Sequence, residues 1–133
     1  MWDIDYGYIE PWLDDQDDAS VASIFAALEC LQERGPSLGR PLVDTLAGSK
    51  VKNLKELRPA APGESEIRII FAFDQERRAI MLLGGDKAKG KNGKAKWSGW
   101  YKRAVPEAEK LYEEHLDRLM QAQGAGELGV NHG

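Results

Sequence analysis

The segment from Glu66 to Arg103 constrains the fold of this chain more than any other segment. Its first part alternates apolar and polar side chains, as in a strand with one buried face, and the apolar positions are Ile67, Ile69, Phe71 and Phe73. The sequence DQER at 74–77 predicts a turn, and the apolar run AIMLL at 79–83 predicts a central strand buried on both faces. Strands joined by so short a turn run antiparallel, so we expect a hairpin at the centre of a sheet.

Two more strands are predicted earlier in the chain. Residues 2–9 alternate in hydrophobicity, which indicates a half-buried strand. Residues 50–58 predict a strand with Val51, Leu54 and Leu57 as its apolar members, and the sequence PAAPG at 59–63 predicts a turn towards the hairpin. The strand at 50–58 and the hairpin together predict an antiparallel meander.

Two longer segments have the periodicity of amphipathic helices. The first spans residues 17–34, has acidic residues at its start and Gly35 at its end, and carries the apolar stripe Val21, Ile24, Phe25, Leu28 and Leu31. The second begins near Pro106 and carries the stripe Ala108, Leu111, Tyr112, His115, Leu116 and Leu119. Short helical turns are expected at 10–13 and 41–46. These elements predict an α+β fold in one domain over residues 1–123, followed by a disordered tail at 124–133.

Charge is distributed unevenly along the chain, although the net charge is only −4. Residues 1–48 carry a charge of −8, residues 49–104 carry +8 and residues 105–133 carry −4. Much of the positive charge lies in the lysine- and glycine-rich segment 84–99, which we expect to be a mobile loop. A basic region between acidic ends is typical of a nucleic-acid-binding surface. Chance clustering of solvated lysines is the alternative.

The composition argues against a disulfide, a metal site and a membrane span. Cys30 is the single cysteine, so no intrachain disulfide is expected, as is usual in a reducing cytosol. The only histidines are His115 and His132, so we expect no zinc site, and we interpret His115 as a structural residue of the last helix. No stretch is apolar enough for a signal peptide or a membrane span. We therefore expect a cytoplasmic protein without a cofactor.

Cationic and aromatic residues are the remaining candidates for chemistry. Arg68 projects from a hairpin strand on the face opposite the first long helix, Lys87 follows the second hairpin strand, and Tyr101 follows the loop, while Lys55 lies on the preceding strand. This set suits metal-free cleavage of RNA, because the 2′-hydroxyl supplies the nucleophile and positioned cations stabilise the charge that builds on the phosphate oxygens. The candidate RNA-binding residues are Lys50, Lys52, Arg58, Lys89, Lys91, Trp97 and Trp100. A structural arginine with solvated lysines and core aromatic residues is the alternative interpretation.

Several ordered motifs resemble a known family. They are GPSLGRPLVDTLAGSKVKNLKELR at 35–58, IRIIFAFD at 67–74, AIMLLGGDK at 79–87, the pair WY at 100–101, Pro106, Ala108 and LYEEHL at 111–116. Over residues 12–119 the chain resembles the HigB/RelE-type toxins of type II toxin–antitoxin systems, in the branch related to phage-derived Gp49-like proteins. The resemblance implies two N-terminal helices packed on a twisted, mainly antiparallel sheet, with a further helix at the C-terminal end. It also implies a ribosome-dependent endoribonuclease that cleaves mRNA, and a cognate helix-turn-helix antitoxin that neutralises it.

The resemblance also suggests roles for the candidate residues. Arg68 matches the strand arginine that contacts the scissile phosphate, Lys87 matches a basic residue after the next strand, and Tyr101 matches a C-terminal aromatic residue. Lys55 matches only loosely, and Glu56 stands where RelE is more basic, so the proton-transfer group stays open. A ParE-like toxin that inhibits gyrase without cleaving RNA, and a non-toxic nucleic-acid or phage-related interaction module, are the alternatives.

Overall fold

A computed structural model describes the backbone of residues 1–46, 48–60, 66–87 and 94–132, and the side chains of these residues apart from 94–98 and 123–132. The elements in chain order are β1 (Asp3–Asp5), the 3-10 helix η1 (Gly7–Ile9), α1 (Glu10–Asp14), α2 (Asp18–Arg34), the 3-10 helix η2 (Gly35–Ser37), β2 (Val43–Thr45), β3 (Lys55–Leu57), β4 (Ile67–Phe73), β5 (Arg78–Asp86) and α3 (Lys94–His132). The strands form one sheet in the order β1-β5-β4-β3-β2, in which β1 is parallel to β5 and the other pairs are antiparallel. The predicted α+β class with a mainly antiparallel sheet is confirmed.

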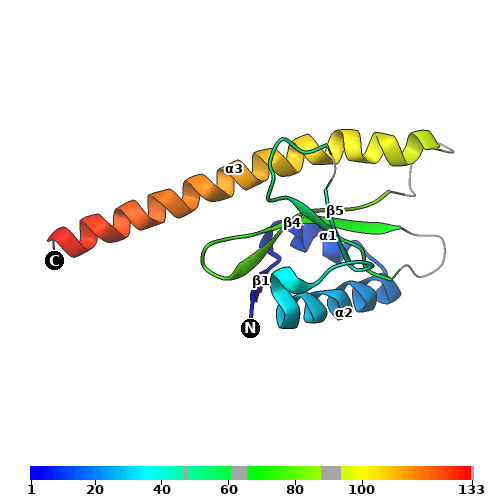
Figure 1. Ribbon diagram of the computed structural model, residues 1–133, viewed down its shortest axis with the longest axis horizontal. Helices are drawn as coiled ribbons and strands as arrows, with labels where there is room; N and C mark the ends of the chain where they lie inside the picture. The colour runs from blue at the N-terminus through cyan, green and yellow to red at the C-terminus, as the bar shows by residue number, and fades with distance from the viewer. Residues whose placement is uncertain (47, 61–65, 88–93, 133) are drawn as a thin grey trace.

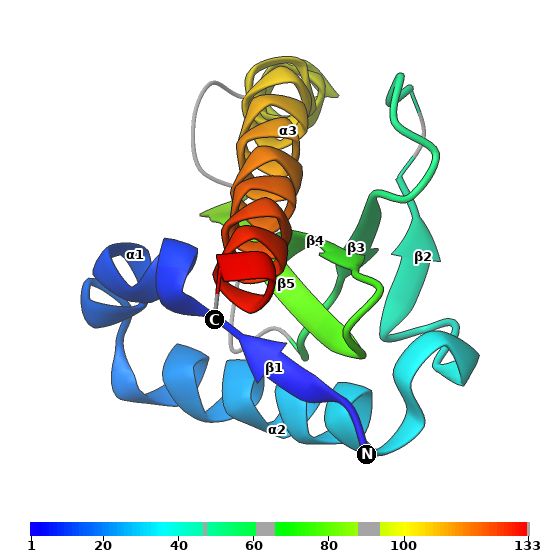
Figure 2. The ribbon, with the colours of Figure 1, turned by 90° about the vertical axis from the view of Figure 1, so that its left-hand side faces the viewer.

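Helices cover both faces of the sheet (Figures 1 and 2). Ile67, Ile69 and Phe71 of β4 pack with the buried side of α2, as their alternation predicted. Ile70 and Ala72 point to the other face and pack under α3. Arg68 belongs to this second face, because residues two apart on a strand point the same way. The sheet therefore separates a core under α2 from a core under α3.

The predicted helix at 17–34 is confirmed, and local chemistry explains its ends. Asp17 caps α2 by accepting a hydrogen bond from the Ser20 N–H at 2.7 Å. Gly35 ends it with a φ of +54°, and a Cβ at this position would lie 2.2 Å from the Trp2 indole nitrogen. Phe25 was predicted in the buried stripe, but it is 38% exposed and stacks edge-on against Tyr6, which is 37% exposed.

Several boundaries differ from the prediction. The strand predicted at 2–9 ends at Asp5 because the chain enters η1, and the strand predicted at 50–58 is only three residues long, Lys55–Leu57. A helical turn was predicted at 41–46, but β2 forms there by pairing with β3, a long-range contact that local pattern does not reveal. The segment 84–99, predicted as a mobile loop, supplies the end of β5 and the start of α3, while residues 88–93 lie outside the described part.

The last helix is much longer than predicted. It starts at Lys94, so Pro106 lies inside it and not at its start, and its C-terminal half extends past the sheet (Figure 1). Its backbone is helical to His132, and the disordered tail expected from Gly124 stays a prediction. The end of the domain at residue 123 stays a prediction.

Gly84 and Gly85 let two tryptophans pack closely on opposite faces of β5. A Cβ on Gly84 would lie 2.4 Å from the Trp12 ring, and one on Gly85 would lie 2.2 Å from the Trp100 indole nitrogen. Successive strand residues point to opposite faces of the sheet. Gly84 therefore contacts Trp12 of α1 on one face, and Gly85 contacts Trp100 near the start of α3 on the other. The contact at Gly85 fixes where α3 begins its path over the sheet.

Gly85→Ala is therefore expected to destabilise the protein by about 1–3 kcal/mol, because the methyl group forces Trp100 away from β5. Urea denaturation would measure the change. Gly39→Ala is the matched control, since a Cβ there meets no atom within 4 Å. An equal effect of both substitutions would contradict the close-packing role of Gly85.

Candidate functional site

A groove of about 690 Å³ opens at the β2 edge of the sheet, between β2, β3 and the start of α3. Tyr101 lines it together with six charged residues, namely Arg40, Asp44, Glu56, Arg58, Lys87 and Lys102. Four of these are basic and two are acidic, so the groove has a net charge of +2. We call it the basic groove.

Glu56 is the buried centre of the basic groove. It is 3% exposed, and its two carboxylate oxygens accept hydrogen bonds from Arg58 Nε at 2.8 Å and from the Tyr101 hydroxyl at 2.7 Å. The strand register explains the cluster, because Asp44 of β2 lies directly opposite Glu56 of β3. Two carboxylates in that relation repel each other. Arg58, two residues further on the same face, bridges them with its Nη2 at 2.6 Å from Glu56 and 3.4 Å from Asp44.

Tyr101 is held as a protonated hydrogen-bond donor. Burial raises the pKa of its hydroxyl, and the hydrogen bond and negative charge of Glu56 raise the pKa further. Its ring lies 4.9 Å from that of Trp100, which packs on Gly85. The position of Tyr101 is therefore set by the contact between α3 and β5, and its hydroxyl direction is set by Glu56.

Lys87 and Arg68 lie next to Tyr101. The Lys87 Nζ is 5.7 Å from the centre of the Tyr101 ring. Burial lowers the pKa of Lys87, and the charge of Arg68 lowers it further, against opposing effects of Glu66 and Glu56. Arg68 donates from Nη1 to the carbonyl oxygen of Ile67 at 2.8 Å, and its buried Nε has no hydrogen-bond partner in the described part of the chain. Arg68 does not line the groove, but its charge acts on both Lys87 and Tyr101.

The structure brings three of the four predicted catalytic residues together and separates the fourth. Lys55 lies beside Glu56 in sequence, but its partner on β4 is Phe71, which belongs to the core under α2, so Lys55 and Glu56 point to opposite faces of the sheet. Lys55 does not line the basic groove, and its catalytic role stays a prediction.

The predicted RNA-binding residues fall into three groups. Arg58 lines the basic groove, and Lys50 lines an adjacent groove of about 400 Å³ that also reaches Tyr101. Lys52 is exposed in a turn, and Trp100 is half-buried against Gly85. Lys89, Lys91 and the side chain of Trp97 lie outside the described part.

The sequence interpretation missed four of the charged residues that line the groove. Arg40, Asp44 and Lys102 were not proposed as site residues, and Glu56 was regarded only as a departure from the family pattern. One signal was available for Glu56: it lies two residues before Arg58, so that a strand places both on one face. The pairing of β3 with β2, which brings Asp44 alongside, had no local signal.

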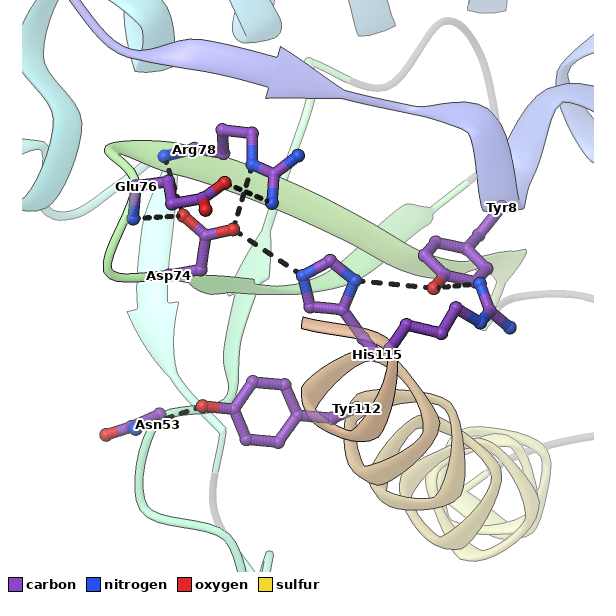
Figure 3. Close-up of polar contacts among 8 residues, drawn as sticks. Tyr8, Asn53, Asp74, Glu76, Arg78, Tyr112 and His115 are labelled. Atoms are coloured by element: carbon purple, nitrogen blue, oxygen red, sulfur yellow. Dashed lines mark hydrogen bonds and ion pairs between the residues drawn. The ribbon is translucent and has the colours of Figure 1, made fainter. Parts of the chain in front are cut away.

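A second polar cluster fastens α3 to the opposite end of the sheet (Figure 3). His115 is 6% exposed, with Nδ1 3.4 Å from the Tyr8 hydroxyl and Nε2 3.5 Å from Asp74 Oδ2. The second contact is longer than a good hydrogen bond, and Nε2 has no hydrogen-bond partner in the described part of the chain. Asp74 also accepts hydrogen bonds from the N–H groups of Glu76 and Arg78 and from Arg78 Nε, at 2.9–3.0 Å. His115 is thus a buried histidine that ties a helix to a turn, as the structural interpretation predicted.

This cluster gives a test based on pH. Burial alone would raise the pKa of Asp74, but the N–H groups of Arg78 and Glu76 and the Arg78 guanidinium outweigh it and lower the pKa below its usual value. A lowered pKa in the folded state contributes stability above the unfolded pKa of about 3.9, and this contribution is lost as the pH falls through the folded pKa. Asp74→Asn is therefore expected to cost about 1.5–3 kcal/mol at pH 7 and much less below pH 3. Chemical denaturation at both pH values would show this, with the exposed Asp15→Asn as control.

Two general features of the described residues bear on the choice of chemistry. No helix among them is both long and apolar enough to cross a membrane. In the same part of the chain, no three His, Cys, Asp or Glu side chains are grouped so that they could hold a metal ion. The charged and phenolic groups of the basic groove are four cations, two carboxylates and the Tyr101 hydroxyl.

Comparison with known proteins identifies the family. The chain is 47% identical over 115 residues to "Putative toxin HigB2" of Mycobacterium tuberculosis (strain ATCC 25618 / H37Rv), an alignment that covers 86% of this chain and 54% of that protein. It is 43% identical over 108 residues to "Putative toxin HigB3" of the same organism, covering 81% of this chain and 87% of that protein. The chain thus spans about half the length of HigB2 and most of HigB3. A model of the family described as phage-derived protein Gp49-like matches residues 11–113, and the chain therefore belongs to this family, as its motifs predicted.

Proposed function

We propose that this protein is the toxin of a type II toxin–antitoxin system and that it inhibits translation by cleaving mRNA without a metal ion. The names of HigB2 and HigB3 support the toxin assignment. The observation that carries the RNA cleavage is the 2.7 Å hydrogen bond from Tyr101 to the buried Glu56, inside a groove of net charge +2 and beside Lys87. A basic groove attracts a phosphate backbone, and the tyrosine–glutamate pair can move a proton.

The proposed reaction uses the 2′-hydroxyl of the RNA as nucleophile. This oxygen attacks the adjacent phosphorus, the bond to the 5′-oxygen breaks, and the products are a 2′,3′-cyclic phosphate and a free 5′-hydroxyl. The proton of the 2′-hydroxyl passes to the Tyr101 oxygen while the Tyr101 proton passes to Glu56. Lys87, whose lowered pKa makes it a stronger acid than an ordinary lysine, donates a proton to the leaving 5′-oxygen.

Arg68 is proposed to stabilise the negative charge that builds on the non-bridging phosphate oxygens. Its buried Nε has no hydrogen-bond partner in the described part of the chain, which suits a group that binds a ligand. The charge of Arg68 acts on Lys87, so the two side chains lie near each other. Both cations are proposed to contact the same phosphate group. Arg58 and Arg40, which are paired with Glu56 and Asp44, are proposed to guide the RNA backbone at the mouth of the groove.

The proposed partners are a helix-turn-helix antitoxin encoded alongside, mRNA, and the ribosome on which the mRNA is cleaved, all in the cytoplasm. A ribosome supplies ordered mRNA, and a small basic groove need not then provide sequence recognition of its own. This proposal includes no cofactor.

One experiment tests the proposed function: induce the chain alone, follow growth, and map the 5′ ends of cellular RNA. We expect growth to stop and new 5′ ends to appear within translated mRNA. Growth arrest with a DNA-damage response and no new RNA ends would replace the proposal with gyrase inhibition. Unchanged growth and unchanged RNA ends would replace it with a non-toxic interaction module.

A further inference from the structure

Two grooves flank β1, at the edge of the sheet opposite the basic groove. One, of about 320 Å³, runs along β1 to Glu10 and Arg78, and the other, of about 400 Å³, lies between β1 and α2. Asp3, Ile4 and Tyr6 line both. We call this region the β1–α2 surface. With four strand spacings between β1 and β2, it lies about 19 Å from the edge that carries the basic groove.

The β1–α2 surface is acidic. Four of the residues that line it are carboxylates, namely Asp3, Asp5, Glu10 and Glu29. Its one basic lining residue, Arg78, is already paired with Asp74 and Glu76. The surface therefore carries the charge opposite to that of the basic groove and repels a nucleic acid.

The same surface exposes apolar area at its centre. Tyr6 and Phe25 are 37% and 38% exposed, and their rings stack edge-on with centroids 5.7 Å apart. They are two of the four large hydrophobic residues that are exposed among the described side chains. A paired aromatic anchor ringed by charge is the usual composition of a protein-binding surface.

The free edge of β1 supplies backbone groups to such a partner. β1 is the first strand of the sheet order, so among the described residues it pairs with one strand only, β5, while the N–H of Trp2 just before it donates to the carbonyl oxygen of Gln32 in α2 at 3.0 Å. Figure 2 shows it at the rim of the sheet beside α2. An unpaired strand edge offers N–H and C=O groups to an added strand, whose alternate side chains then face the flanking grooves.

From these observations we infer that the β1–α2 surface docks an extended, basic segment of a partner protein, which adds as a strand to β1 and inserts an apolar side chain against Tyr6 and Phe25. Lysine or arginine side chains of the segment pair with Asp3, Asp5 and Glu29. A second copy of this chain is not the occupant, because the same carboxylates would face one another. The inference does not rest on RNA cleavage, since the surface and the basic groove lie at opposite edges of the sheet.

The probe is a ten-residue peptide that alternates lysine with valine and isoleucine, and its matched control replaces each lysine by glutamate. Backbone amide NMR of the full chain would follow both titrations. We expect the lysine peptide alone to shift amide signals of residues 3–6 and 25–32. Absence of binding, or equal shifts from both peptides, would overturn the inference.

Two sets of variants locate the site. Asp3→Lys with Glu29→Lys is expected to weaken binding of the lysine peptide at least tenfold and to create binding of the glutamate peptide. Asp14→Lys with Asp15→Lys makes the same change of net charge at exposed positions outside both grooves and is expected to leave the preference unchanged. Phe25→Ala is expected to weaken binding about tenfold. If both charge-reversal pairs act equally, the attraction is non-specific and the proposed site is wrong.

Discussion

Arg68→Ala is expected to lower the rate of RNA cleavage by about 10²–10³ and to relieve growth arrest, because it removes a fixed positive charge from the phosphate oxygens in the transition state. Lys87→Ala is expected to have an effect of the same order by removing the proton donor for the 5′-oxygen. Growth after induction and mapped RNA 5′ ends would measure both. Arg68→Lys should recover only part of the activity, since an ammonium lacks the planar fork of the guanidinium.

The effect on stability separates this role from a structural one. Within the described part of the chain, Arg68 donates one hydrogen bond, to its neighbour Ile67, and its buried Nε has no partner there. Its removal should therefore change the free energy of unfolding by less than about 1 kcal/mol, whereas a structural arginine would cost more. Lys110→Ala, an exposed lysine on α3 outside the basic groove, is the control for loss of one positive charge. Full toxicity of both the Arg68 and Lys87 variants would show that the site is misassigned.

The alternation of apolar and polar residues along β4 made it possible to predict which face of the sheet each side chain occupies. It placed Ile67, Ile69 and Phe71 against α2 and Arg68 on the other face, and both placements are found. Periodicity failed for Phe25, which lies at the margin of the buried stripe of α2, beside Ile24 and Leu28, and is 38% exposed. The local sequence pattern did not predict β2, because this strand is only three residues long and is formed by pairing with β3.

In the candidate site, too, local pattern predicts some features, and others depend on strand pairing. The proximity of Arg68, Lys87 and Tyr101 could be predicted, because each follows or lies on a recognisable element. The choice between Lys55 and Glu56 could not, because a shift of one residue in a short strand moves a side chain to the other face of the sheet. The register of β3 against β2 and β4 places Glu56, not Lys55, beneath Tyr101. The sequence left the proton-transfer group open, and we propose the Glu56 carboxylate for it because Glu56 accepts the hydrogen bond of the Tyr101 hydroxyl.

Glu56→Gln and Tyr101→Phe are each expected to slow RNA cleavage by about 10²–10⁴, because each breaks the same proton path while keeping nearly the same shape. Glu56→Gln also deprives Arg58 of a counter-charge 2.6 Å away and should cost about 1–3 kcal/mol of stability. Tyr101→Phe keeps the ring that packs against Trp100 and should cost less. Cleavage would therefore be measured at a temperature at which denaturation shows both variants to be folded.

The double variant decides between a shared proton path and two separate contributions. If the Tyr101 hydroxyl works only by passing its proton to Glu56, removing both groups should be no slower than removing one, since residues that act as a unit are not additive. If Glu56 serves only to hold Arg58 and Tyr101 in place, Tyr101→Phe should slow the reaction further in the Glu56→Gln background. Multiplied losses in the double variant would contradict the relay and leave Glu56 as a positioning residue of the groove.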